Sequence, residues 1–429
     1  MARLRHRLRF AARRTTATSA ILLGGALLTG LPGCVERQYP RPPQIGATLP
    51  AVPAQPPGTP SPVAARRGVT ILAPITGPNA ERGDALVRAA QLAMVDVPLD
   101  VRDTGGTAAG AAAAAQAAIA AGAGLFIGPL TGAETRAVAP VARAAHVPVL
   151  AFTNDAAAGG NGVWTLGITP VQQVRRLVAA SVGQGKSRFA AVLPDSGFGH
   201  SMGNALIEAT GATGVAAPEV RYHGQGTAAI QSAMREVSGY ATRRGPLDAQ
   251  LRDARARHDT AAVAELKSQG VGAPPFDTLL LADTGDQLAL LSTFLPYYDV
   301  DPSSVRLLGP ALWATASLRG GAGVGGAWYA APDPAARSEF DTAYNAKYGA
   351  PAPGLADLAY DAASIARLAA PDGFAANTLE RSDGYAGVDG LLALQPDGTV
   401  RRALAVFQVG GDTAQPIQPA PGSLSDPGS

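Results

Sequence analysis

Short apolar runs alternate with segments of helical periodicity after residue 68. Residues 69–76 (VTILAPIT) form the first run, and residues 82–94 follow with apolar side chains at helical spacing. The sequence predicts further strands at 99–102, 124–127 and 147–153, and further helices at 108–121 and 132–145. Continuous apolar strands joined by helices are typical of a parallel sheet covered on both faces. These residues therefore predict a doubly wound α/β lobe.

The same alternation resumes at Pro170 and predicts a second α/β lobe. We expect strands at 188–193, 220–223, 276–283 and 305–308, and helices at 171–182, 199–210, from about 228, 287–295, 334–348 and 355–369. The chain closes with a predicted hairpin of residues 390–395 and 400–409. Asp397 and Gly398 form its turn, because Asp-Gly is a strong turn dipeptide.

A charged segment interrupts the second lobe. Residues 238–270 combine interspersed arginines and aspartates with apolar positions such as Leu247, Leu251 and Leu266. This spacing predicts a helical hairpin inserted at the surface. Because basic and acidic side chains alternate, the pattern favours a solvated excursion over a nucleic-acid-binding arm.

Composition and charge limit the classes of function. Hydrophobic residues make up 47% of the 429 residues and charged residues 16%, which is enough apolar material for one or two cores. The formal charge of +2 depends on six arginines within residues 1–33. Without that segment, 29 basic side chains face 33 acidic ones, and the net charge is −4. An acidic body releases few phosphate counterions, so we do not expect nucleic acid as a partner.

Residues 1–33 have the features of a signal peptide. The six arginines precede residues 17–31, an uncharged stretch that suits an export signal and is too short to span a bilayer. The segment ends next to Cys34, the single cysteine of the chain, and one cysteine excludes an internal disulfide framework or a CxxC motif. An uncleaved anchor helix with an incidental cysteine is the alternative interpretation.

Residues 31–34 (LPGC) resemble the bacterial lipobox, in which the cysteine receives diacylglycerol. The resemblance implies lipidation at Cys34, and two or three acyl chains hold a protein stably on a membrane. Val35 stands where lipoproteins retained in the inner membrane carry aspartate. A lipid anchor in the outer membrane, on the periplasmic face, is therefore implied.

Two segments have compositions that disfavour packing. Residues 34–67 are rich in proline and predict an extended tether of about 90 Å between the lipid and the folded body. Residues 411–429 are predicted to be a disordered tail. The folded body is therefore expected to begin near residue 68.

Three segments of the first lobe resemble a known family. Residues 69–79 (VTILAPITGPN), 128–135 (GPLTGAET) and 147–153 (VPVLAFT) are similar to the type I periplasmic binding fold of the leucine/isoleucine/valine-binding family, and the similarity covers about residues 68–409. The lipobox, the tether, the insertion and residues 308–313 (LGPALW) are more similar to the penicillin-binding protein activator lipoproteins than to transporter subunits.

This resemblance implies a two-lobed fold whose chain crosses between the lobes three times. One lobe would consist of residues 68–168 and 326–372. The other would consist of residues 169–325 and 384–410, including the insertion.

Candidate binding residues follow from the order of the strands. Ligands of open α/β sheets sit beyond the carboxyl ends of the strands, next to helix amino termini. The residues predicted there are Thr76, Gly77, Asn79, Thr131, Glu134, Thr135, Thr153 and Asn154 in the first lobe, and Asp195, Ser196, Phe198, Asp283, Thr284 and Trp313 in the second. We expect these two groups to form a ligand cleft.

The resemblance implies that a hydroxyl side chain within residues 131–135 captures the carboxylate of an amino acid. Here Glu134 places a negative charge in that helical turn, and like charges at about 4 Å cost roughly 1 kcal/mol even in water. The resemblance also implies an acidic residue near 308–313 for the ligand's ammonium group, and that segment contains none. Thr131 or Thr135 could still donate a hydrogen bond, so a free amino acid stays a minority candidate.

Enzyme signatures fail on order or spacing. Residues 185–187 (GKS) lead into a predicted strand, the reverse of a phosphate-binding loop, and no predicted helix follows the GxGxxG match at 321–326. Asp195, Ser196 and His200 bring together an acid, a hydroxyl and an imidazole, but we interpret Asp195 or Ser196 as a helix cap. The chain is therefore predicted to have no catalytic site, metal or cofactor.

Two functions fit these observations. The first is a lipoprotein that activates a penicillin-binding protein in peptidoglycan synthesis. The alternative is the substrate-binding component of an ABC transporter for branched-chain amino acids or a related small solute, with an ABC permease as partner. Both imply attachment to a membrane through the lipid anchor, and a hydrolase at residues 195–200 ranks below them.

Overall fold

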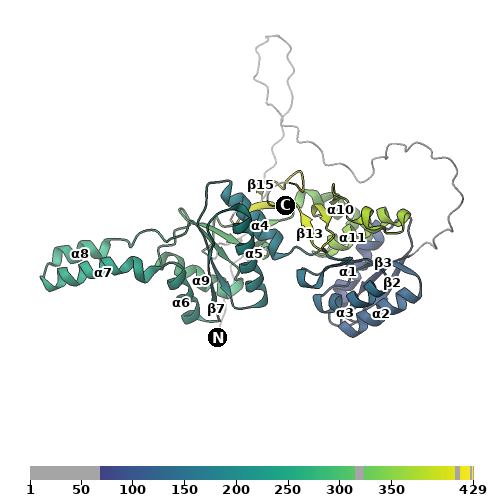
Figure 1. Ribbon diagram of the computed structural model, residues 1–429, viewed down its shortest axis with the longest axis horizontal. Helices are drawn as coiled ribbons and strands as arrows, with labels where there is room; N and C mark the ends of the chain where they lie inside the picture. Colours follow the sequence, from purple (N-terminus) through teal and green to yellow (C-terminus); the bar gives the residue numbers. More distant parts are fainter. Residues whose placement is uncertain (1–67, 315–322, 411–415, 426–427, 429) are drawn as a thin grey trace, which may run out of the picture. The chain divides into compact units, whose positions relative to one another are not determined.

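The computed structural model describes residues 68–314, 323–410, 416–425 and 428 (Figure 1). The predicted signal peptide, Cys34 and the predicted tether lie outside these ranges. No helix within the described ranges is long and apolar enough to cross a membrane.

The first lobe is built on a parallel sheet with the strand order β2-β1-β3-β4-β5. Its strands are β1 (Gly68–Ala73), β2 (Leu99–Asp103), β3 (Ala123–Ile127), β4 (Val149–Ala151) and β5 (Val163–Thr165). The connections are α1 (Ala80–Ala93), α2 (Ala108–Ala120), α3 (Gly132–Ala144) and the short 3-10 helix η1 (Ala156–Ala158).

Both faces of β1 are buried, which explains its uninterrupted apolar sequence. Val69 and Ile71 pack with α1 and with α11 (Ala356–Ala369) in one core. Leu72 faces a second core, formed with α2 and α3. The first sheet therefore carries a helical layer on each face, as the sequence predicts.

The second lobe is built on a mixed sheet with the strand order β15-β14-β10-β9-β8-β6-β7. Its strands are β6 (Phe189–Pro194), β7 (Glu219–His223), β8 (Thr278–Leu281), β9 (Arg306–Gly309), β10 (Trp328–Ala331), β14 (Ala405–Gln408) and β15 (Pro416–Gln418). Helices α4 (Pro170–Val182) and α5 (Gly197–Thr213) pack in one core of this sheet, and α6 (Thr227–Val237) and α9 (Gly285–Tyr297) in the other.

A small antiparallel sheet follows the last long helices. It consists of β11 (Tyr385–Gly387), β12 (Gly390–Leu394) and β13 (Val400–Arg402). The turn between β12 and β13 includes Gly398, whose φ is +84° and whose N–H donates to the carbonyl oxygen of Gln395 at 2.9 Å. This is the Asp-Gly turn that the sequence predicts. The preceding elements are α10 (Pro334–Tyr348), α11, the 3-10 helix η4 (Ala370–Asp372) and α12 (Ala376–Leu379).

The division of the chain between the two cores differs from the predicted one at two places. The sequence predicts residues 326–372 in the first lobe, but β10 pairs with β9 and β14 in the second sheet. It predicts residues 384–410 in the second lobe, but side chains of β11, β12 and β13 pack in the core of the first sheet, and only β14 joins the second sheet. Strand pairing between residues far apart in sequence decides these assignments, and local periodicity does not report it.

Four short strands differ from the prediction. β5, β10 and β11 lie in segments without a strand prediction, and β15 lies in the predicted disordered tail. β15 pairs antiparallel with β14, so residues 416–418 are part of the second sheet. The tail prediction is therefore wrong for these residues.

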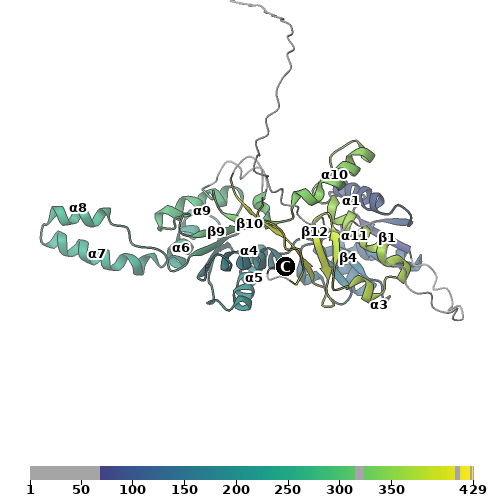
Figure 2. The same ribbon diagram turned by 90° about the horizontal axis from the view of Figure 1, so that it is seen from above.

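The insertion is a helical hairpin of α7 (Tyr240–Ala256) and α8 (Thr260–Ser268), as predicted. Figures 1 and 2 show the two helices side by side. Leu247, Leu251 and Ala254 are the buried residues of α7, and α8 has none. The hairpin therefore adds little to the core of the second sheet.

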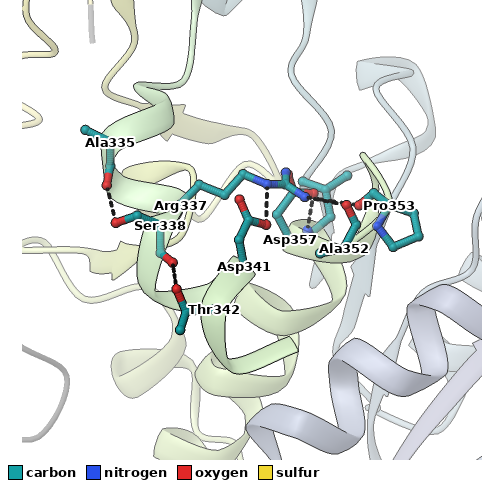
Figure 3. A network of polar contacts seen from close by, with 9 residues as sticks. Ala335, Arg337, Ser338, Asp341, Thr342, Ala352, Pro353 and Asp357 are labelled. Carbon is teal, nitrogen blue, oxygen red and sulfur yellow. Dashed lines mark hydrogen bonds and ion pairs between the residues drawn. The ribbon is translucent and has the colours of Figure 1, made fainter. Parts of the chain in front are cut away.

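Arg337 on α10 ties that helix to α11 (Figure 3). Its Nε donates to Oδ1 of Asp341 at 3.0 Å, another nitrogen donates to the carbonyl oxygen of Pro353 at 3.1 Å, and the guanidinium pairs with Asp357. Burial raises the pKa of Asp357 to about 8 and the negative charge of Asp389 adds to the shift, although Arg337 opposes it. A buried carboxyl group with a raised pKa thus lies at this helix joint.

Candidate functional site

The residues predicted from strand order lie at the carboxyl ends of strands in both sheets. In the first sheet they follow β1, β3 and β4, and in the second they follow β6, β8 and β9. The decisive question is whether their polar groups are open to a ligand or already satisfied by one another.

The amino terminus of α3 is closed by its own side chains. Thr131 is the N-cap, its hydroxyl accepts the N–H of Glu134 at 3.2 Å, and the Glu134 carboxylate accepts the N–H of Thr131 at 3.0 Å. This reciprocal arrangement is a capping box. Glu134 Oε2 also accepts the Thr131 hydroxyl at 2.7 Å, and Glu134 Oε1 accepts the hydroxyl of Thr104 at 2.6 Å.

The two threonines of this turn are therefore committed within the protein. The hydroxyl of Thr135 donates to the carbonyl oxygen of Thr131 at 2.8 Å, and Thr135 is fully buried. Glu134 is also 0% exposed. The sequence predicts that Glu134 repels an anion docking at this turn, and the structure adds that its carboxylate accepts both the N–H and the hydroxyl of Thr131, which such an anion would otherwise meet.

The loop after β1 is organised by a carboxylate that the prediction missed. Asp103 accepts the hydroxyl of Thr76 at 2.7 Å and the backbone N–H groups of Ile75 and Gly105, each at 2.8 Å. Its slight burial favours the neutral acid, but these hydrogen bonds prevail and lower the pKa of Asp103. Asp103 directly follows the predicted strand 99–102, so the sequence alone would have allowed its place at the sheet edge to be predicted.

Three other predicted residues of the first lobe lie outside the capping box of α3. Gly77 has φ of +85°, and a Cβ there would lie 3.0 Å from the carbonyl oxygen of Gly105. Asn79 precedes α1 without capping it and instead accepts a hydrogen bond from Arg82 at 3.1 Å. Asn154 is exposed beyond β4. These positions shape the sheet edge and leave polar groups at the surface.

Thr153 also lies beyond β4, where it holds the next turn. It is buried, and its hydroxyl accepts the N–H of Asp155 at 3.1 Å. Asp155 in turn caps η1 and forms an ion pair with Arg136 of α3. The Thr153 hydroxyl therefore supports a loop at the sheet edge.

The second sheet holds a buried polar chain at its carboxyl edge. Oδ2 of Asp283 lies 3.1 Å from Nε2 of His223, and both side chains are 2% exposed. His223 Nδ1 donates to the carbonyl oxygen of Gly224 at 2.9 Å. Burial alone favours the neutral imidazole, but the hydrogen bonds to Asp283 and Gly224 outweigh it and raise the pKa of His223. A protonated imidazole satisfies both acceptors.

Trp313 completes this chain. Its Nε1 donates to the carbonyl oxygen of Asp283 at 2.9 Å, and the residue is buried in the 3-10 helix η2 (Ala311–Ala314). The ring packs directly on Gly309, where an added Cβ would come within 2.1 Å of it. Strand order predicted Asp283 and Trp313 but not His223, although His223 ends the predicted strand 220–223.

The segment after β6 begins a helix and does not form a nucleophilic triad. Ser196 is the N-cap of α5, and its hydroxyl accepts the N–H of Gly199 at 3.1 Å. His200 Nε2 lies 2.8 Å from Oδ1 of Asp195, so the imidazole is turned to the acid and not to the serine. A base must contact its nucleophile for general-base activation, so this geometry fits a helix cap.

The last two predicted residues differ in exposure. Phe198 is partly buried and packs against the core beneath α4 and α5. Thr284 precedes α9, makes no capping hydrogen bond through its side chain, and is exposed. Within the described part of the chain, no group of three or more His, Cys, Asp or Glu residues is arranged to hold a metal ion. The arrangement can present hydrogen-bonding groups to a partner, and nothing in it assembles a nucleophile with a base.

Comparison with known proteins gives one family. The model of the family described as periplasmic binding protein matches residues 68–414. No curated protein sequence matches the chain.

Solved structures share the fold at low sequence identity. A structure described as a candidate branched-chain amino acid ABC transporter from Rhodospirillum rubrum has a TM-score of 0.62 and 18% identity, over 82% of this chain and 99% of that one. The leucine-binding protein LivK from Thermotoga maritima has a TM-score of 0.51 and 18% identity, over 83% and 99%. Full-length LpoA from Haemophilus influenzae has a TM-score of 0.59 and 16% identity, over 82% of this chain and 59% of LpoA.

Proposed function

The chain belongs to the periplasmic binding protein family, and from that premise we propose that it is a non-enzymatic activator of a penicillin-binding protein in peptidoglycan synthesis. The observation that carries the proposal is the closed amino terminus of α3, where Glu134 and Thr131 satisfy each other. A solute receptor of this fold needs donors that are free to meet its ligand.

The free-energy cost of binding a carboxylate ligand at the amino terminus of α3 supports the proposal. A carboxylate ligand would have to displace Glu134, and each hydrogen bond to a charged group contributes about 1.5–3 kcal/mol. If Glu134 stayed in place, two like charges at about 4 Å would repel by about 1 kcal/mol in water and about 4 kcal/mol near a protein surface. The repulsion near a protein surface alone equals about half of the roughly 8 kcal/mol that micromolar binding represents.

The second sheet also lacks an open anchor for an ammonium group. Residues 308–313 contain no acid, and the nearby carboxylate of Asp283 is engaged by His223. Trp313 fills the space over Gly309. Neither charged end of an amino acid therefore meets a free partner among these residues.

Structural likeness supports an activator as readily as a receptor. LpoA, a penicillin-binding protein activator, shares the fold, and the sequence resembles the activator lipoproteins in its lipobox, tether and insertion. We propose that Cys34 carries the lipid, that the anchor lies in the outer membrane, and that residues 34–67 let the folded body reach a synthase from the periplasmic face. The remaining exposed groups, such as Asn154 and Thr284, would contact a protein partner.

Two measurements on the purified full-length lipoprotein test this function. Isothermal titration with leucine, isoleucine and valine should give no heat of binding, while a leucine-binding protein under the same conditions serves as the positive control. Glycan polymerisation by the bifunctional penicillin-binding protein of the same organism should accelerate when the lipoprotein is added. Unchanged polymerisation together with saturable binding of an amino acid would refute the proposal.

The alternative function is the substrate-binding component of an ABC transporter. Its support is the likeness to the Rhodospirillum rubrum structure, which extends over nearly all of that chain. The partner would then be an ABC permease and the ligand a branched-chain amino acid or a related small solute. Micromolar affinity in the titration would select this alternative.

A further inference from the structure

The α7–α8 hairpin has no evident part in stabilising the fold, yet it is firmly attached. The guanidinium group of Arg243 holds the base of the hairpin, where the chain enters and leaves it. Arg243 donates to the carbonyl oxygens of Ser238 and Tyr298, each at 2.8 Å, donates to that of Gly272, and pairs with Asp299 at 3.6 Å. Ser238 precedes the hairpin and Gly272 follows it, so this side chain joins both of its ends to the end of α9.

Aromatic rings also stabilise the base of the hairpin. Tyr240, the first residue of α7, packs edge-on against Tyr298 with ring centroids 5.1 Å apart. It also stacks on Tyr297 at 6.1 Å. Aromatic pairs of this kind add stability beyond their buried area. The hairpin is therefore a preformed arm and not a loosely attached loop.

The charge of the arm is opposite to that of the body. Residues 240–269 carry six basic and four acidic side chains, a net charge of +2. The other residues from 68 to 429 carry 19 basic and 28 acidic side chains, a net charge of −9. An anionic partner is therefore repelled by the body and attracted by the arm, which directs its approach.

Basic groups near the arm's tip are free to meet such a partner. Arg252 and Arg255 stand three residues apart on α7, a spacing that places them on one face of the helix. Both are exposed, and the ion pairs that the described residues of the arm make involve Arg243 and Arg244 instead. These two guanidinium groups are exposed and make no ion pair with the described residues, so both present positive charge to solvent.

We infer that the α7–α8 arm is the docking element for an acidic protein surface, and that, if the proposed function holds, this surface belongs to the penicillin-binding protein. A lipid surface fits the arm less well. Membrane-binding helices insert a continuous apolar face, whereas Leu247, Leu251 and Ala254 are buried within the hairpin. The groove between α7 and α8 is lined by residues of both charges, including Asp253, Arg257 and Glu265, which suits a protein partner.

The test uses the full-length lipoprotein and the purified ectodomain of the bifunctional penicillin-binding protein from the same organism. Their affinity is measured by surface plasmon resonance at about 50 and about 300 mM salt, where charge effects are strong and weak respectively. The double variant Arg252→Glu/Arg255→Glu should bind about tenfold more weakly than the wild type at low salt, with a smaller difference at high salt. The matched control is Lys347→Glu/Arg367→Glu on α10 and α11, which should bind as the wild type does.

The possible outcomes distinguish a failure of the docking role of the arm from a failure of the proposed activator function. Equal binding by the wild type and the arm variant overturns the docking role and leaves the activator function standing. Absence of binding by the wild type overturns both. Vesicles of phosphatidylglycerol and sedimentation of the protein alone complete the test, because arm-dependent binding to vesicles, or arm-dependent self-association, without arm-dependent binding to the synthase would also overturn the inference.

Discussion

Replacing Glu134 by alanine tests the central feature of the site. The substitution removes a buried carboxylate that accepts three hydrogen bonds, from the hydroxyl of Thr104 and from the hydroxyl and N–H of Thr131. Loss of a helix cap alone costs about 1 kcal/mol. Three independent hydrogen bonds to a charged group, at about 1.5–3 kcal/mol each, set an upper limit of about 9 kcal/mol. We expect a loss of about 3 kcal/mol, since the donors left behind are only partly rehydrated.

This loss of stability corresponds to a decrease in the melting temperature. Unfolding entropy of about 2.1 cal/mol/K per residue gives about 0.7 kcal/mol/K for a folded body of about 350 residues. Glu134→Ala should therefore lower the melting temperature by about 4 °C in differential scanning calorimetry. Glu208→Ala is the control, because Glu208 is exposed on α5 and pairs with Arg175 at 3.1 Å, and surface pairs contribute at most about 1 kcal/mol.

The reasoning fails if the two variants melt alike. A shift below about 1 °C for Glu134→Ala would mean that its carboxylate is solvated and that the donors of Thr131 are open to a ligand. An amino acid ligand could then bind at this turn without displacing Glu134.

Two further predictions concern the second sheet edge and the buried acids. Gly309→Ala should push the Trp313 ring from its site and destabilise the fold by about 1–3 kcal/mol; an unchanged indole N–H resonance in the NMR spectrum would contradict it. Burial, strengthened by a nearby carboxylate, raises the pKa of Asp357 to about 8 and that of Asp361 to about 7. Above the usual aspartate pKa of about 4, the folded state holds protons that the unfolded chain releases. The stability that these groups contribute is therefore greatest below that pH and declines by up to about 1.4 kcal/mol per pH unit for each proton, until the pH passes the folded pKa values of about 7 and about 8. Urea midpoints at pH 6 and pH 9 measure this decline, which Asp361→Asn should reduce; equal slopes for variant and wild type would contradict the assignment.

Much of the secondary structure follows from local sequence. The bounds predicted for α10 match those observed, and α2 and α4 differ from prediction by one residue at one end. Caps and apolar periodicity mark these helices within a few residues, so no distant contact is needed to recognise them. The same holds for the α7–α8 hairpin, whose charge pattern set it apart from the sheets.

Sequence reasoning locates some of the polar groups at the sheet edges and misses others. Strand order placed Thr131, Asp283 and Trp313 at the sheet edges, but it missed two of their partners, Thr104 and His223. The capping box was readable as Thr131-x-x-Glu134, yet Glu134 was interpreted as a charge facing a ligand. His223 and Asp283 lie 60 residues apart, so their pairing could not be read from local spacing.

Local sequence is enough to predict the α/β class, the order of most strands and helices, and the sheet edges where the candidate residues lie, because periodicity and capping act between near neighbours. The pairing of distant strands makes β10 join the second sheet and residues 416–418 extend it, and the polar groups at the two sheet edges satisfy one another only in the folded chain. These outcomes depend on which strands pair and which side chains lose water. Both are properties of contacts between distant residues, for which a single sequence carries no local signal.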